Sequence, residues 1–191
     1  MRYTSDIFSS TLEVKHSKFI AFLVPYTKYK QQLQTLKENH PKARHFVVAY
    51  RYLNEYNQIV EHSSDDGEPK GTSGKPSLFV LQGADIINSA VIIVRYFGGI
   101  KLGTGGLVRA YSDAVNLVLD SANLIQYIKE VEEVIEFEYS KIRVVDYEAS
   151  VYGVTITEKI FDTKATYNIK ATQKDMDAFL QKMQRVVRVS R

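Results

Sequence analysis

The chain has 191 residues, of which 45% are hydrophobic and 25% charged, a balance that excludes a disordered tail, a fibre and a collagen. It contains no cysteine, which excludes disulfides, thiolate metal sites and cysteine nucleophiles and fits a reducing compartment. The formal net charge of +3 is too small to predict nucleic-acid binding by itself. Without a membrane-length apolar run or an apolar signal segment, we expect a cytoplasmic protein with no membrane partner.

The first part of the chain predicts strands around one helix. The apolar run 19–24 is typical of a strand that is buried on both faces. Thr27 is expected to cap a helix that ends near His40. Aromatic and β-branched residues at 45–52 predict a further strand, and we expect residues 58–62 to pair with it as a hairpin.

The middle of the chain is rich in glycine and proline. Nine of the ten glycines lie within residues 67–106, so the segment 63–76 is expected to be a loop. Pro76 suits the first position of a helix that runs to about Gly83. A buried strand is predicted over 90–94, followed by a glycine-rich loop. The helix after that loop has apolar residues at a period of 3.6, namely Leu107, Ala110, Tyr111, Ala114, Val115 and Val118.

From residue 131 onward the pattern predicts a second domain. Its expected elements are a strand at 131–137, a helix at 141–150, strands at 151–161 and 164–171, a helix at 173–184 and a strand at 186–189. This β-α-β-β-α-β order is that of the split-βαβ or ferredoxin-like plan. We therefore predict an α+β protein with two domains, residues 1–128 and 129–191.

The junction between the strand at 90–94 and the helix after it is the first candidate site. Glycine lets backbone N–H groups approach a ligand, and a helix N-terminus offers unpaired N–H groups to an anion. A tight turn is the alternative interpretation, because neither common phosphate-binding glycine motif is present. We predict a surface that binds an anion or nucleic acid, formed by Lys18, His45, Arg95, Tyr96, Gly98, Gly99, Lys101, Gly103, Thr104, Gly105, Gly106 and Arg109.

Three closely spaced carboxylates, Asp65, Asp66 and Glu68, form the second candidate. We expect them to partner the basic residues Arg95 and Lys101. A magnesium site, a catalytic carboxylate and a solvated turn are the alternatives. The histidines lack metal-ligand spacing, and no G-x-S-x-G nucleophile motif occurs. We therefore predict no metal site and no cofactor, and we assign no catalytic residue.

Three segments together resemble the signature of the IMPACT/YigZ family: S-D-D-G-E-P at 64–69, G-T-S-G-K-P at 71–76 and R-Y-F-G-G-I-K-L-G-T-G-G-L-V-R-A-Y-S at 95–112. The segments around Lys18 and His45 are also similar to family blocks. The resemblance covers essentially the whole chain. It implies an N-terminal domain like the second domain of ribosomal small-subunit protein five, and a C-terminal ferredoxin-like domain similar to one in elongation factor G.

The resemblance also implies a function linked to translation. We expect a non-enzymatic regulatory protein that binds RNA or the ribosome; a homo-oligomer stays open. The alternative is an enzyme that acts on a phosphorylated small molecule, with an acidic side chain as base or Mg²⁺ ligand. In a third interpretation the acidic side chains only neutralise Arg95 and Lys101. Eukaryotic relatives carry an extra N-terminal domain that this sequence lacks, so we do not expect their scaffold-binding role.

Overall fold

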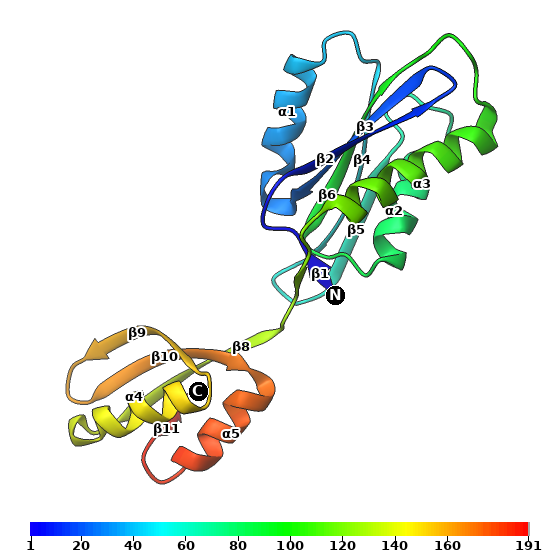
Figure 1. Ribbon diagram of the computed structural model, residues 1–191. Helices are drawn as coiled ribbons and strands as arrows, with labels where there is room; N and C mark the ends of the chain where they lie inside the picture. Colours follow the sequence, from blue (N-terminus) through cyan, green and yellow to red (C-terminus); the bar gives the residue numbers. More distant parts are fainter. Residues whose placement is uncertain (191) are drawn as a thin grey trace. The chain divides into compact units, whose positions relative to one another are not determined.

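The computed structural model describes residues 1–190, which form two compact units that divide after Tyr127. Each unit combines helices with a β-sheet (Figure 1). A short ribbon of β1 (Arg2–Tyr3) and β7 (Ile125–Gln126) joins the two ends of the first unit. In the described part of the chain, none of the helices has the length and hydropathy needed to cross a membrane.

The first unit is built on a five-stranded sheet in which all neighbouring strands are antiparallel. The central strand is β6, whose aliphatic residues are buried on both faces, as expected for a strand covered by helices on both sides. The strands, in spatial order, are β2 (Phe8–Val14), β3 (Ser17–Pro25), β6 (Ser89–Tyr96), β4 (His45–Leu53) and β5 (Ile59–Ser64).

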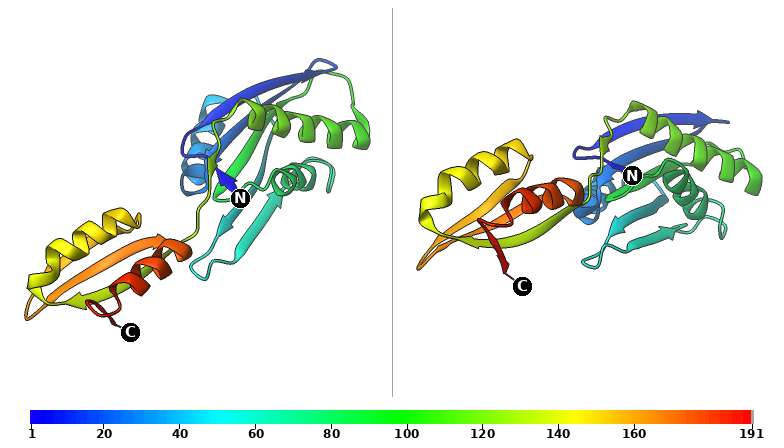
Figure 2. Two further views of the ribbon diagram at one scale, coloured as in Figure 1. Left: turned by 60° about the horizontal axis from the view of Figure 1, so that its bottom comes forward. Right: turned by 90° about the horizontal axis from the view of Figure 1, so that it is seen from below.

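Helices cover both faces of this sheet. Helix α1 (Tyr29–Asn39) packs on one face, and α2 (Gly74–Gly83) and α3 (Gly103–Ser121) pack on the other (Figure 1). Figure 2 shows α3 in green alongside the β2–β3 hairpin in blue, with the β4–β5 hairpin in cyan at the other edge of the sheet.

Side chains alternate along β6 between the two faces. Val94 belongs to the core under α1, whereas Ile93 belongs to the core under α2 and α3. The same alternation places Arg95 on the α3 side and Tyr96 on the α1 side. The prediction that Arg95 and Tyr96 belong to one surface is therefore wrong, because the two residues lie on opposite faces of the sheet.

Several local predictions differ from the structure. Thr27 does not cap a helix, because a 3₁₀ turn (Tyr26–Lys28) precedes α1 and no side chain caps either element. Helix α2 begins at Gly74, so Pro76 occupies its third position rather than its first. The predicted glycine-rich loop is shorter than expected, because residues 103–106 form the first turn of α3. Strand β2 was not predicted.

The second unit contains the predicted β-α-β-β-α-β order of elements. Its four-stranded antiparallel sheet has the order β11-β8-β10-β9. Ile135, Tyr167 and Phe179 are buried at the centre of its core. The strands are β8 (Glu130–Phe137), β9 (Thr155–Phe161), β10 (Ala165–Thr172) and β11 (Arg188–Ser190), and the helices are α4 (Ile142–Val151), preceded by a 3₁₀ turn (Tyr139–Lys141), and α5 (Gln173–Met183).

Candidate functional site

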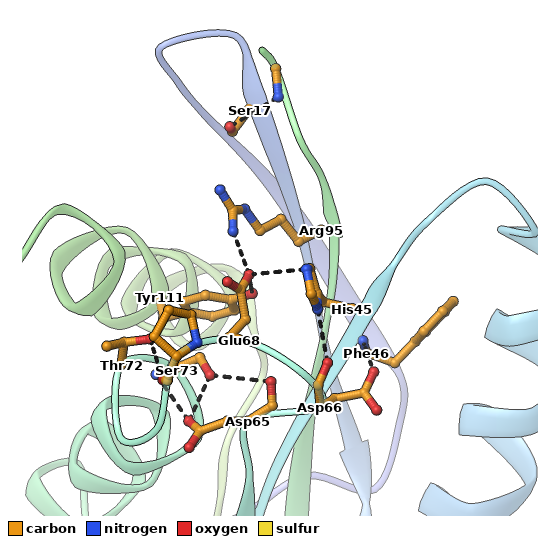
Figure 3. A network of polar contacts seen from close by, with 12 residues as sticks. Ser17, His45, Phe46, Asp65, Asp66, Glu68, Thr72, Ser73, Arg95 and Tyr111 are labelled. Carbon is orange, nitrogen blue, oxygen red and sulfur yellow. Dashed lines mark hydrogen bonds and ion pairs between the residues drawn. The ribbon is translucent and has the colours of Figure 1, made fainter. Parts of the chain in front are cut away.

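Glu68 lies where the acidic loop meets the end of β6. Its side chain is only 3% exposed. Its Oε1 accepts hydrogen bonds from Arg95 Nη1 at 2.5 Å and from Tyr111 Oη at 2.8 Å, and His45 Nε2 lies 3.9 Å from the same oxygen (Figure 3). A carboxylate so deeply buried needs an opposite charge and hydrogen-bond donors. Glu68 and Arg95 thus form a buried ion pair that ties the loop to the sheet.

Tyr111 belongs to this cluster, whereas its place in the sequence pattern predicts only that it lies on the apolar face of α3. Its burial, together with the charge of the neighbouring Glu68, raises the pKa of the phenol above its ordinary value. The phenol therefore stays protonated and donates to Glu68. Phe19 packs edge-on against the Tyr111 ring, with 5.1 Å between the ring centroids. The sequence indicates this role only through the hydroxyl of a tyrosine on a buried helix face, because a buried hydroxyl needs a hydrogen-bond partner.

His45 and Asp66 fix the loop to the start of β4. His45 Nδ1 lies 2.8 Å from the carbonyl oxygen of Asp66. Because a carbonyl can only accept, Nδ1 carries the proton, and Nε2 is turned toward Glu68. The Asp66 carboxylate accepts a 2.6 Å hydrogen bond from the backbone N–H of Phe46. Asp66 therefore bonds to the backbone of β4 rather than to a basic side chain.

Asp65 organises the loop that leads into α2. Its carboxylate accepts hydrogen bonds from the backbone N–H groups of Gly71, Ser73 and Gly74 and from the Ser73 hydroxyl, at 2.7–3.2 Å. Partial burial raises the pKa of Asp65, but these hydrogen bonds outweigh it, and the pKa lies below its ordinary value of 3.8. Of the three carboxylates predicted to meet Arg95, only Glu68 reaches it.

A pocket of about 370 Å³ opens beside this cluster, at the beginning of α3. No side chain caps the N-terminus of α3, and its first turn contains no acidic residue. The unpaired N–H groups and positive dipole end of the helix therefore border the pocket. Its lining residues are Glu68, Pro69, Arg95, Phe97, Lys101, Leu102, Gly103, Thr104 and Leu107.

Arg95 keeps donor capacity after it has paired with Glu68. A guanidinium carries five N–H donors, and its side chain here is 7% exposed. Its Nε is buried without a hydrogen-bond partner among the residues that the structure describes. The guanidinium carbon lies 5.3 Å from the ring centroid of Phe19 and 5.8 Å from that of Phe97. Because Nε has almost no exposed surface, donation to a ligand in the pocket falls to the terminal Nη2, which makes no hydrogen bond among the described residues.

The structure brings part of the predicted surface to this pocket. Arg95, Lys101, Gly103 and Thr104 line it, and His45 lies beside Glu68. The remaining predicted residues, which do not line it, are Lys18, Tyr96, Gly98, Gly99, Gly105, Gly106 and Arg109.

Three of these remaining residues have side chains that are placed elsewhere. The hydroxyl of Tyr96 lies 2.8 Å from His40 Nδ1 on the α1 side of the sheet. Lys18 is the exposed strand partner of Tyr96 on β3. Arg109 is exposed on α3. These positions remove three of the predicted polar side chains from the immediate surroundings of the pocket.

Gly98 anchors the loop that follows β6. A Cβ at this position would lie 2.0 Å from the carbonyl carbon of His16 in the β2–β3 turn. The backbone N–H of Gly98 donates to the buried Ser17 hydroxyl at 3.1 Å. Neither Ser17 nor Phe97 was predicted, since the contact between this turn and the loop depends on the pairing of β3 with β6.

Comparison with known proteins places the chain in a family. The model of the Impact N-terminal domain matches residues 15–119, a range that includes every residue of the pocket and of the Glu68 cluster. A Haemophilus influenzae protein described as an IMPACT family member is 35% identical over 174 residues, which are 87% of this chain and 82% of the relative. The chain belongs to the IMPACT family, which confirms the resemblance seen in the sequence.

Two further comparisons agree with this assignment. The Escherichia coli IMPACT family member YigZ is 37% identical over 133 residues, covering 68% of this chain and 65% of that protein. A crystal structure described as that of an hypothetical protein aligns with a TM-score of 0.70 and 27% identity over 98% of this chain and 95% of the other. Both the sequence and the fold of this chain therefore have known relatives.

Replacing Asp65 with Asn should lower the free energy of unfolding by about 1–3 kcal/mol at neutral pH, because several charge-assisted hydrogen bonds are lost. Since the pKa of Asp65 is lowered by folding, its stabilising effect is complete above the unfolded pKa and disappears as the pH falls through the folded pKa. Urea denaturation at pH 7 and in acid measures this. The exposed Asp113→Asn is the control, and a deficit independent of pH would contradict the assignment.

Gly98→Ala should destabilise the first unit by about 1–3 kcal/mol, the usual cost of forcing extra atoms into a packed site. Gly105→Ala is a matched control, because nothing lies within 4 Å of the added Cβ and alanine favours a helix by about 1 kcal/mol. Thermal denaturation of both variants should therefore show opposite shifts in Tm. Equal shifts would mean that Gly98 is not held by close contact with His16.

Proposed function

We propose that this protein is a non-enzymatic, translation-linked regulatory protein that binds RNA, free or within the ribosome, at the pocket beside Arg95. The observation that carries the proposal is a buried arginine that lines an open pocket, keeps donors beyond its bond to Glu68, and lies beside an uncapped helix N-terminus. Lys101 adds an exposed positive charge at the same pocket. These groups suit a phosphate oxygen, which accepts hydrogen bonds and carries negative charge.

The distribution of charge favours the first unit as the RNA-binding part. Residues 1–129 contain 15 Lys and Arg against 11 Asp and Glu, whereas residues 130–191 contain 10 against 11. In the second unit, Lys164 and Lys170 are paired with glutamates of β8 and its end. Lysines committed to such pairs are poorly placed to neutralise phosphates.

The architecture supports the link to translation. We propose that the first unit is related to the second domain of ribosomal small-subunit protein five, and that the β-α-β-β-α-β unit is a ferredoxin-like domain similar to one in elongation factor G. The resemblance to the family implies both domain types, one from a ribosomal protein and one from an elongation factor. A cytoplasmic location belongs to the same proposal.

The purely structural interpretation accounts for only part of the geometry. The ion pair between Glu68 and Arg95 does lock the acidic loop to the sheet. Lys101 stays exposed, however, and makes no ion pair within the described residues 1–190. The lock also leaves the pocket at the start of α3 open, so it does not remove the groups that would hold an anion.

RNA binding should be strongly salt-dependent and should involve Lys101. We expect the affinity for a single-stranded RNA to fall between about 50 and 200 mM salt, and Lys101→Ala to reduce the slope of log K against log salt by about 0.7. Fluorescence anisotropy measures both quantities, with Lys182→Ala, an exposed lysine on α5, as the control. Binding that is absent, or equally strong at both salt concentrations, would overturn the proposal.

An enzyme acting on a phosphorylated small molecule is the second candidate. It is favoured by the size of the pocket, which suits one small ligand, and by Glu68 in its wall, where His45 lies 3.9 Å away. A thermal-shift series with nucleotides and sugar phosphates, with and without Mg²⁺, distinguishes it from RNA binding. We expect no Mg²⁺-dependent rise in Tm. A rise that Glu68→Gln abolishes would favour the enzyme.

A further inference from the structure

Two exposed phenylalanines lie beside the first turns of α3. Phe97 is 55% exposed and lines the pocket that contains Arg95. Phe79 is 63% exposed and lines a second pocket of about 380 Å³ between α2 and α3. The other residues of this second pocket are Gly71, Lys75, Pro76, Val80, Val108 and Ser112.

The two pockets follow one another along the same elements. Thr104 of α3 lines the first pocket, and Val108 and Ser112 line the second. These residues are four apart, so they share one face of the helix and are separated by about 6 Å per step along its axis. The loop before α2 contributes Pro69 to the first pocket and Gly71 to the second. We call the two pockets together the Phe97–Phe79 groove.

The groove combines aromatic rings with positive charge. Lys101 lines its first part and Lys75 its second, and both lysines are exposed. Exposed rings interleaved with cations are the composition of surfaces that bind single-stranded nucleic acid, since bases stack on the rings while cations follow the phosphates. In a duplex the bases are stacked on each other, and their faces are not available.

The clustered tyrosines Tyr26, Tyr29, Tyr50 and Tyr52 offer no comparable surface. The rings of Tyr26 and Tyr52 stack on each other at 3.9 Å between centroids and an angle of 7°. Tyr50 packs against both Tyr29 and His62. These ring faces are engaged within the protein, whereas Phe79 makes no aromatic pair among the described residues. Phe79 is therefore an exposed aromatic side chain with free ring faces, and it lines a pocket; Tyr56 is more exposed, at 73%, but it lies in the β4–β5 turn and lines neither pocket.

We infer that the Phe97–Phe79 groove binds single-stranded RNA, with a phosphate beside Arg95 and Lys101 and with bases stacked on Phe97 and Phe79. This inference rests on the proposed function and specifies the form of RNA that the site selects. Charge complementarity comes from Lys75 and Lys101, and selection for single strands comes from the two rings.

Phe79→Ala should weaken binding of a labelled RNA strand of about 12 nucleotides roughly tenfold. It should leave the salt slope unchanged and leave binding of the same strand annealed to its complement unaffected. Phe97→Ala is the second variant, and Phe161→Ala, which removes an equally exposed phenylalanine of the second unit, is the control. Anisotropy measures binding, and thermal denaturation of each variant confirms that it is folded.

The outcomes separate this inference from the proposed function. If wild-type protein binds inorganic polyphosphate or duplex as tightly as the single strand, or if Phe79→Ala and Phe97→Ala both bind like wild type, the inference is overturned. Salt-dependent binding that Lys101→Ala still weakens would then leave the proposed function standing. If the wild-type protein binds no RNA at all, the proposed function fails and the inference fails with it.

Discussion

The buried ion pair between Glu68 and Arg95 is the constraint on which the geometry of the first unit's site depends. Two charges that are almost fully removed from water are tolerated when they face each other, and further hydrogen bonds to them reduce the cost of their burial. Tyr111 supplies one such donor from α3. Three separate elements therefore meet at one carboxylate: a loop, a central strand and a helix. Their meeting sets the position of Pro69, and with it one wall of the pocket.

The same pair also defines what Arg95 can contribute to binding. The charge of Arg95 is largely balanced by Glu68, so Arg95 adds little net positive charge to the pocket. It contributes hydrogen-bond donors whose positions are already fixed. The net positive character of the pocket comes from Lys101 and from the first turn of α3. A site of this kind holds an anion by preorganised hydrogen bonds and needs little rearrangement when the ligand arrives. The ion pair with Glu68 is therefore compatible with the phosphate site that we propose.

The sequence pattern predicted correctly those helices and strands whose local preference agrees with their contacts in the folded protein. Strand β6 contains an unbroken aliphatic run, and the apolar residues of α3 recur at helical spacing from Leu107 to Val118. The pattern failed where distant contacts decide the outcome. Helix α3 includes the glycines at its start although glycine has a low helix propensity, because burial of the apolar face of α3 stabilises the helix. Strand β2 alternates between half-buried and exposed residues. This alternation is a weak signal, and the segment forms a strand because it pairs with β3.

The pairing of Glu68 with Arg95 followed from opposite charge, but no local rule connects either residue to Tyr111. The placement of Tyr96 was the avoidable error, because adjacent residues of a strand face opposite sides.

Two of the glycines around α3 are required for different structural reasons. Gly98 is required by the close approach of the β2–β3 turn, and Gly103 by its positive φ of 74°. Gly105 has neither reason, since its φ is not positive and a Cβ there would meet nothing within 4 Å. Glycine in a helix interior costs roughly 1 kcal/mol relative to alanine, and Gly105 is the third residue of α3. Gly105 does not line the pocket beside Arg95, so a ligand in that pocket does not explain this glycine either. The need for glycine around the start of α3 is therefore set by Gly98 and Gly103, and Gly105→Ala shows whether position 105 accepts a side chain.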